Sequence, residues 1–239
     1  MADRFYSPDP PVEGRIVLEG DEARHLARVR RVGPGCVVEV FDGKGFASVA
    51  EVVSVGRDRV ELALAGEPLP ERAPPCRLTL ATAIPKGERF DWLVEKATEL
   101  GVACLIPLVT ERSVVDPRET KLARLRRLTI EASKQCGRSR LLEIEPPVPL
   151  PRLIAESVAS VRVLAHPRGF PPARWPRIPV GGSAVLAIGP EGGFTEQEIA
   201  LARESGWTLG DLGTTLLRIE TAGLAGGSLL LALCGDDVE

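Results

Sequence analysis

The segment 187–194, with the sequence Ala-Ile-Gly-Pro-Glu-Gly-Gly-Phe, has the residue types of a ligand-binding loop. It follows an apolar run, 184–188, that is typical of a buried strand, and it precedes the helix-capping pattern Thr195-x-x-Glu198. Glycines after a strand let the backbone approach a ligand and offer it free N–H groups. One glycine would indicate only a tight turn, but three glycines around a carboxylate favour a binding site. The segment lacks the spacing of phosphate-binding and dinucleotide-binding loops.

The segment 211–222 is the second stretch that could carry chemistry. It contains two charged residues, Arg218 and Glu220, in an otherwise apolar run that leads into the last expected helix. These residues could simply be a solvated pair at a helix start, where a glutamate suits the helix dipole. Because this loop and the loop 187–194 both follow strands of the same region, we favour a shared ligand site.

Positive charge is confined to two strips, although the net charge of the chain is −3. Residues 24–31 contain four arginines and His25, and residues 112–140 contain nine Lys or Arg against three acidic residues. Most charged runs are solvated faces of helices. Two confined strips in an acidic protein nevertheless favour binding of a polyanion such as RNA.

The elements that must position these residues divide the chain into two domains. Residues 1–70 contain short alternating runs and the hairpin signal Asp42-Gly43, which predict a small β-barrel. One helix is expected at 21–31, with Leu26 and Val29 facing inward. A proline-rich segment, 66–75, separates the domain 1–70 from the domain 71–239. In the second domain, strands alternate with helices, which predicts an α/β fold with a parallel sheet. The strands are expected at 78–84, 104–109, 161–165 and 184–188. The helices are expected at 90–100, 120–136, 195–205 and 219–233.

Composition excludes several classes of protein. Hydrophobic residues make up 44% and charged residues 26%, which is typical of a folded protein. Five widely spaced cysteines and two histidines predict neither a metal site nor a disulfide framework. The sequence shows no signal peptide and no membrane-length apolar stretch, so we expect a cytoplasmic protein. The lack of Asn, the excess of Arg over Lys and 21 prolines favour a thermophilic source, although a GC-rich genome would give the same bias.

The motifs 189–193 and 212–222 resemble paired motifs of the ribosomal RNA small subunit methyltransferase E family. These are SPOUT-class enzymes that use S-adenosylmethionine to methylate N3 of a uridine in 16S ribosomal RNA. One departure is Thr214-Thr215, where the family carries a basic residue. Further similar segments follow in order along nearly the whole chain: Arg4–Tyr6, His25–Arg31, Pro85–Gly87, Glu95–Gly101, Glu111–Ser113 and Glu131–Gln135.

The resemblance implies a fold and an assembly. It implies a PUA-like β-barrel for RNA binding at 1–70 and a SPOUT α/β domain with a deep trefoil knot at 71–239. It also implies S-adenosylmethionine bound in the knot, a homodimer, and a substrate within the small ribosomal subunit. The last helix is apolar nearly all round, which suits either a central core helix or one covered by a second subunit.

The chemistry of the implied reaction nominates the residues of the site. Uracil N3 is a weak nucleophile until its proton leaves, so a cation near its oxygens and a carboxylate to take the proton would promote methylation. We expect Arg218 to be the cation and Glu191 or Glu220 the proton acceptor. We expect the cofactor to contact Leu164, His166, Ile188, Gly189, Pro190, Glu191, Gly192, Gly193, Leu212, Gly213, Leu216, Leu217 and Arg218. We expect RNA to contact Arg4, Arg24, Arg28, Arg30, Arg31, Lys86, Arg89, Arg112, Lys134, Arg138 and Arg140.

Three other functions stay open from the sequence. A non-catalytic RNA-binding or ribosome-assembly module could keep this fold without binding S-adenosylmethionine. A SPOUT enzyme that acts on transfer RNA would share the C-terminal motifs. A nucleotide-dependent oxidoreductase is disfavoured, because the chain lacks the glycine pattern and the following acidic residue that such enzymes need.

Overall fold

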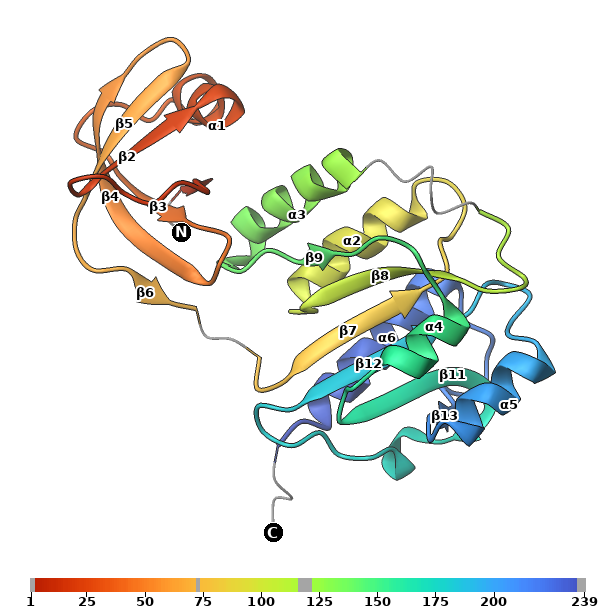
Figure 1. Cartoon of the computed structure of the whole chain (residues 1–239). Coiled ribbons are helices and arrows are strands. Elements are labelled where there is room, and N and C mark those ends of the chain that lie inside the picture. The colour runs from red at the N-terminus through yellow and green to blue at the C-terminus, as the bar shows by residue number, and fades with distance from the viewer. Residues whose placement is uncertain (1–2, 72–73, 116–121, 236–239) are drawn as a thin grey trace. The chain divides into compact units, whose positions relative to one another are not determined.

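The computed structural model describes residues 3–71, 74–115 and 122–235. It divides into two compact units, which Figure 1 shows with the chain coloured from its N-terminus to its C-terminus. The first unit combines residues 1–73 with residues 130–141, and the second combines residues 74–129 with residues 142–239. The membership of 130–141 in this unit was not predicted, because local composition does not record a contact between segments so far apart.

The first unit is built on a six-stranded sheet of order β1-β3-β4-β5-β2, with β6 paired to β4. Strands β1 and β3 are parallel, and the other pairs are antiparallel. The predicted hairpin is confirmed: Oδ1 of Asp42 accepts hydrogen bonds from the N–H groups of Lys44, Gly45 and Phe46 at the turn between β3 and β4. The strands are β1 (Arg4–Tyr6), β2 (Arg15–Glu19), β3 (Val37–Phe41), β4 (Phe46–Val55), β5 (Arg59–Leu64) and β6 (Leu69–Pro70).

The helix expected at 21–31 differs from the prediction. The chain forms a short α-helix, α1 (Gly20–Arg24), that continues as a wider π-helical turn over His25–Arg30. The wider turn changes which side chains face the core. Leu26 is fully buried as expected, but Val29 is 67% exposed, so its predicted inward position is wrong.

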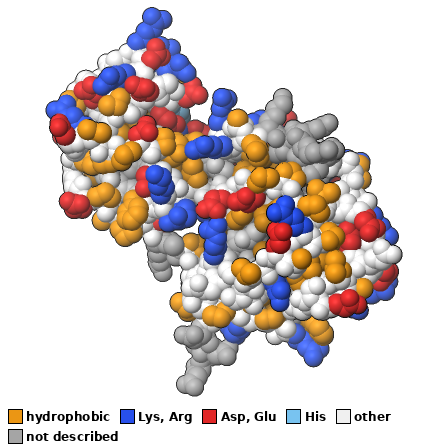
Figure 2. Space-filling view, viewed as in Figure 1, with side chains coloured by type: hydrophobic (Ala, Val, Ile, Leu, Met, Phe, Trp, Pro, Cys, Tyr) orange, Lys and Arg blue, Asp and Glu red, His pale blue; other side chains and the backbone are white. Residues whose placement is uncertain are grey.

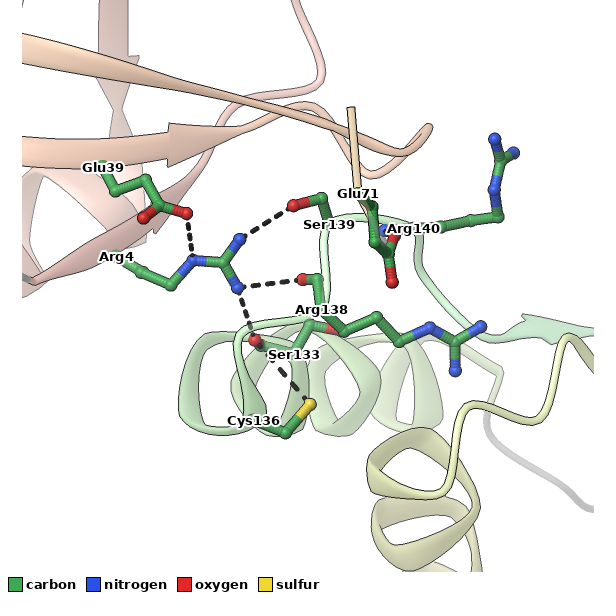
Figure 3. Close-up of polar contacts among 8 residues, drawn as sticks. All are labelled: Arg4, Glu39, Glu71, Ser133, Cys136, Arg138, Ser139 and Arg140. Carbon is green, nitrogen blue, oxygen red and sulfur yellow. Dashed lines mark hydrogen bonds and ion pairs between the residues drawn. The ribbon is translucent and has the colours of Figure 1, made fainter. Parts of the chain in front are cut away.

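A buried arginine joins the two segments of the first unit (Figure 3). Nη1 of Arg4 donates to the carbonyl oxygens of Ser133 and Arg138 at 2.9 and 3.0 Å, and Nη2 donates to Oγ of Ser139 at 2.9 Å. Nε of the same guanidinium pairs with Glu39 at 2.7 Å. Ser133 lies in the last turn of α3 (Leu122–Cys136), and its carbonyl oxygen also accepts from the N–H of Gly137 at 3.1 Å. Arg4 thus holds the helix end and the following loop against β1.

The second unit contains a seven-stranded sheet of order β10-β8-β7-β12-β11-β13, with β9 paired to β8. Every pair is parallel, which confirms the predicted parallel sheet. Parallel strands end at the same edge of a sheet, so their following loops come together. The strands are β7 (Arg77–Thr82), β8 (Cys104–Val109), β9 (Glu143–Ile144), β10 (Val148–Pro149), β11 (Val161–Phe170), β12 (Ser183–Ile188) and β13 (Thr208–Gly210).

Helices cover both faces of this sheet (Figure 1). Apolar side chains of α2 (Arg89–Glu99) and α6 (Ile219–Ala232) form one core with β7 and β12. Those of α4 (Leu150–Glu156) and α5 (Glu196–Glu204) form a second core on the opposite face. The small residues of α6 serve its own sheet: a Cβ at Gly226 would lie 2.7 Å from Leu186, which is why a glycine stands there. Among the described residues, no helix is long and apolar enough to cross a membrane.

Candidate active site

A cavity of about 790 Å³ opens beside the ends of β11, β12 and β13. Its walls come mainly from three segments, 165–167, 188–194 and 211–219. The pairing of β11 with β13 is interrupted after Ala165, and the interruption frees the stretch that contains His166 to line the cavity. A cavity of this size at the carboxyl edge of a parallel sheet is typical of a site for a small organic ligand.

The structure brings together nearly all of the side chains that we expected to hold a cofactor. Leu164 is the exception: it is fully buried in the core shared with α4 and α5, and it does not line the cavity, which corrects that expectation. Its neighbour Ala165 lines the cavity instead, because successive side chains of a strand point to opposite faces. The expected residues that line the cavity are His166, Ile188, Gly189, Pro190, Glu191, Gly192, Gly193, Leu212, Gly213, Leu216, Leu217 and Arg218.

The sequence reasoning missed several lining residues. Phe194 and Asp211 are two of them, and both adjoin the motifs that were singled out. Thr214 and Thr215 also line the cavity. Their hydroxyls bring no positive charge to this wall.

Glycine is required at two positions of the loop 189–193, for different structural reasons. A Cβ at Gly189 would lie 3.0 Å from the ring of Phe194, so a side chain there would displace the ring. Gly193 has a φ of 67°, and its N–H donates to the carbonyl of Pro190 at 2.8 Å. The loop is therefore a tight turn pressed against an aromatic ring, and only glycine meets both conditions at low cost.

Two contacts attach the loop that follows β8, one to this turn and one to the start of α5. Nη1 of Arg112 donates to the carbonyl of Gly192 at 2.8 Å. Oε1 of Glu198, a residue that is only 4% exposed, accepts from the N–H of Glu111 at 3.0 Å. Oε2 of Glu198 accepts from the N–H of Thr195 at 2.8 Å and completes the predicted capping box of α5. One buried carboxylate thus fixes a helix start and a neighbouring loop.

Both candidate proton acceptors lie near one guanidinium. Nη1 of Arg89 lies 3.7 Å from Oε1 of Glu220, and Nη2 lies 4.0 Å from Oε1 of Glu191. The Glu191 side chain is 49% exposed at the cavity, whereas that of Glu220 is 7% exposed, and its Oε2 is buried without a hydrogen-bond partner. Arg218, the N-cap residue of α6, is exposed and lines the cavity.

His166 is oriented by the backbone of its own loop. Its Nδ1 accepts a hydrogen bond from the N–H of Arg168 at 3.1 Å, so a neutral ring carries its proton on Nε2. Partial burial lowers the pKa of His166, and the positive charge of Arg168 lowers it further. A neutral imidazole with a free N–H donor is therefore part of the cavity wall.

Three of the residues expected to contact RNA are buried or paired within the protein. Arg4 and Arg138 are 8% and 7% exposed. The ammonium group of Lys134, whose side chain is 9% exposed, is paired with Glu22 and Glu131. Buried or paired in this way, these side chains have little capacity to reach a phosphate.

Eight expected RNA contacts remain accessible at least in part. Two of them form close ion pairs, Arg24 with Asp21 and Arg30 with Asp3, and Arg89 lies within 4.0 Å of both Glu191 and Glu220. Basic and acidic side chains are interspersed on the face shown in Figure 2. The other six are Arg28, Arg31, Lys86, Arg112 and Arg140, which are exposed, and Arg89, which is partly exposed.

One group among the described residues has ligand atoms close enough to hold a metal ion. Cys104, Glu143 and Glu145 place one such atom each within 4.8 Å of the others. They lie at the start of β8, at the edge of the sheet opposite the cavity, and Glu143 is already paired with Arg77 at 2.5 Å. This group therefore has no part in the cavity.

Comparison with known families defines the class of protein. The model of an RNA methyltransferase domain matches residues 72–231, and that of an RNA methyltransferase PUA domain matches residues 18–64. The fold and the cavity thus belong to an RNA methyltransferase.

Individual relatives define the family. Ribosomal RNA small subunit methyltransferase E of Aquifex aeolicus is 32% identical over 230 residues, 95% of this chain and 98% of the relative. The protein of the same name from Bacillus subtilis is 30% identical over 220 residues, 87% of this chain and 86% of the relative. The crystal structure of the Neisseria gonorrhoeae protein of that name, bound to S-adenosylmethionine, covers 100% of both chains with a TM-score of 0.88 and 31% identity. This chain belongs to the ribosomal RNA small subunit methyltransferase E family.

Proposed function

We propose that this protein uses S-adenosylmethionine to methylate N3 of a specific uridine in the 16S ribosomal RNA of the small subunit. The observation that carries the proposal is the cavity at the carboxyl edge of the parallel sheet, lined by both C-terminal motifs. It is supported by the structure of the Neisseria gonorrhoeae relative, which is bound to S-adenosylmethionine and superposes over the whole chain.

The residues of the cavity fit this cofactor. Ile188, Leu212 and Leu217 provide apolar walls for an adenine ring, and the glycine turn allows close approach to its polar edge. The Nε2–H group of His166 is a donor for a carboxylate or a ring nitrogen. The bound cofactor supplies an activated methyl group, so the protein has to align it and activate the acceptor.

The difference between the two carboxylates supports a choice of proton acceptor. Glu220 has a buried oxygen that lacks a partner, and an orphaned buried acceptor is costly unless a donor reaches it. Glu220 is not among the residues that line the cavity, so its carboxylate would have to turn toward the cavity to accept the N3 proton of uracil. Glu191 is half exposed and can bind water instead. Glu220 is thus the proposed proton acceptor, and Arg218 the cation that stabilises negative charge on the uracil oxygens.

Further features of the proposal concern the fold and the assembly. The first unit is a PUA-like barrel that binds RNA, mainly through its exposed arginines. The loops around the cavity form a deep trefoil knot, and two copies of the chain form a homodimer. The enzyme works in the cytoplasm, where ribosomal subunits assemble.

Transfer of labelled methyl groups tests the proposal. The substrates are small ribosomal subunits that lack the native methylation, free 16S ribosomal RNA and transfer RNA, and the product nucleoside is identified. We expect label as 3-methyluridine from subunits or ribosomal RNA. Label only in transfer RNA would overturn the substrate assignment. If the protein neither binds S-adenosylmethionine nor transfers label to RNA, a non-catalytic assembly module is favoured.

A further inference from the structure

All three nitrogens of the Arg89 guanidinium have a defined direction. Nε donates to the carbonyl oxygen of Lys86 at 3.1 Å. That bond fixes the plane of the guanidinium, so Nη1 faces Glu220 and Nη2 faces Glu191. Gly87, with a φ of 70°, makes the turn that returns the Lys86 carbonyl toward Arg89. The guanidinium is therefore aimed at the two carboxylates by its own loop.

Glu220 is the carboxylate that depends most on this cation. Glu220 is nearly enclosed, and a buried carboxylate without a cation carries a large desolvation cost. Two carboxylates near one point also repel each other. Arg89 offsets both effects, because it lies within 4.0 Å of each of them.

Arg89 also joins three elements that are separate in sequence. It is the first residue of α2, Glu191 belongs to the turn after β12, and Glu220 lies in the first turn of α6. Two of these elements line the cavity. Removing the guanidinium would free the turn and the helix start to move apart.

The geometry points to Arg89 as a positioning residue, which holds Glu220 and Glu191 in place for proton transfer rather than binding an RNA phosphate. This inference rests on the proposed function, because it assigns Arg89 a role through Glu220. It replaces the phosphate contact that the sequence suggested for Arg89.

The decisive experiment is a double-mutant cycle with Arg89→Ala, Glu220→Gln and the double variant. We expect Glu220→Gln to lower kcat by about 100-fold, and Arg89→Ala to lower it by about tenfold. In the Glu220→Gln background, Arg89→Ala should lower kcat by less than about twofold, since its partner is already lost. The dissociation constant for RNA should stay within about twofold of that of the unmodified protein, because no phosphate contact is removed.

Two further variants separate positioning from general loss of structure. Arg89→Lys keeps the positive charge but loses the planar guanidinium that faces both carboxylates. Its kcat should lie between those of Arg89→Ala and the unmodified protein. Arg152→Ala, which removes an exposed arginine paired with Glu156 on α4, is the matched control and should leave kcat unchanged. Additive losses in the cycle, or a weaker RNA affinity with an unchanged kcat in Arg89→Ala, would overturn the inference.

A measurement without cofactor or RNA keeps this inference distinct from the proposed function. The melting temperatures of the four proteins in the cycle should also be non-additive, because the ion pair exists in the free protein. If the unmodified protein transfers no methyl group, the proposed function fails. Additive shifts in melting temperature would instead contradict the pairing of Arg89 with Glu220.

Discussion

Arg218 is the cavity residue whose charge the proposed reaction uses most directly. It lines the cavity from the N-cap position of α6 and has no acidic partner among the ion pairs of the described residues. We expect Arg218→Ala to lower kcat by about 100-fold, since removing one preorganised donor to a developing anion has an effect of that order. The dissociation constant for S-adenosylmethionine, measured by calorimetry, should change by less than about threefold. Equal losses in kcat and in cofactor affinity would assign Arg218 to cofactor binding.

His166 makes the stability of the protein depend on pH. Its pKa is lowered by burial and by Arg168, so below the ordinary value of 6.5 the unfolded chain binds a proton that the folded protein resists. The free energy of unfolding should therefore fall as the pH falls from 7 toward 5. His166→Gln should remove this part of the pH dependence in urea titrations at several pH values. Identical pH slopes for both proteins would contradict the assignment.

At the scale of elements, Glu198 is the residue that fixes a helix start and a loop together. Glu198→Ala removes the acceptor for the N–H groups of Thr195 and Glu111. We expect the free energy of unfolding to fall by about 2 kcal/mol, since two donors lose their partner. Gln197→Ala, at an exposed position of the same turn, is the control and should change it by less than about 0.5 kcal/mol. A loss of the same size in both variants would contradict the role given to the Glu198 carboxylate, because alanine does not lower helix propensity.

The elements that the sequence predicted well are those encoded locally. The Asp42-Gly43 hairpin and the Thr195–Glu198 capping box each depend on hydrogen bonds between residues at most four positions apart. The parallel sheet followed from the alternation of strands and helices. The helix at 21–31 was described wrongly, because apolar spacing does not separate a π-helical turn from an α-helix at this length.

The site residues that belong to sequence motifs were predictable. Those that reach the site only through tertiary contacts were not. Both motifs line the cavity, but no sequence pattern showed that Arg89, about one hundred residues earlier, would face Glu191. Basic character likewise did not separate exposed arginines from Arg4. Burial depends on segments that meet only in the folded protein.

At the scale of the whole molecule, Arg4 contributes to stability rather than to RNA affinity. Arg4→Ala leaves the carbonyls of Ser133 and Arg138 and the carboxylate of Glu39 without their shared donor. We expect the free energy of unfolding to fall by roughly 3 kcal/mol. Arg28→Ala, at an exposed position, should leave stability unchanged but weaken RNA binding and reduce its salt dependence. Chemical denaturation and RNA titrations at several salt concentrations would distinguish the roles of Arg4 and Arg28. An Arg4→Ala variant that stays stable but binds RNA more weakly would support the phosphate contact expected from the sequence.

The division of the chain also limits how the protein can be dissected. The backbone passes between the two units three times, after residues 73, 129 and 141, so a single cut cannot release either unit whole. A fragment that ends near residue 70 would expose the surface that residues 130–141 cover and would leave the Arg4 guanidinium without its acceptors in that segment. Such a fragment should be soluble and folded only when a peptide spanning 130–141 is supplied in trans or fused to its end. During synthesis, the N-terminal unit accordingly has to wait until more than half of the chain has left the ribosome before it can complete its fold.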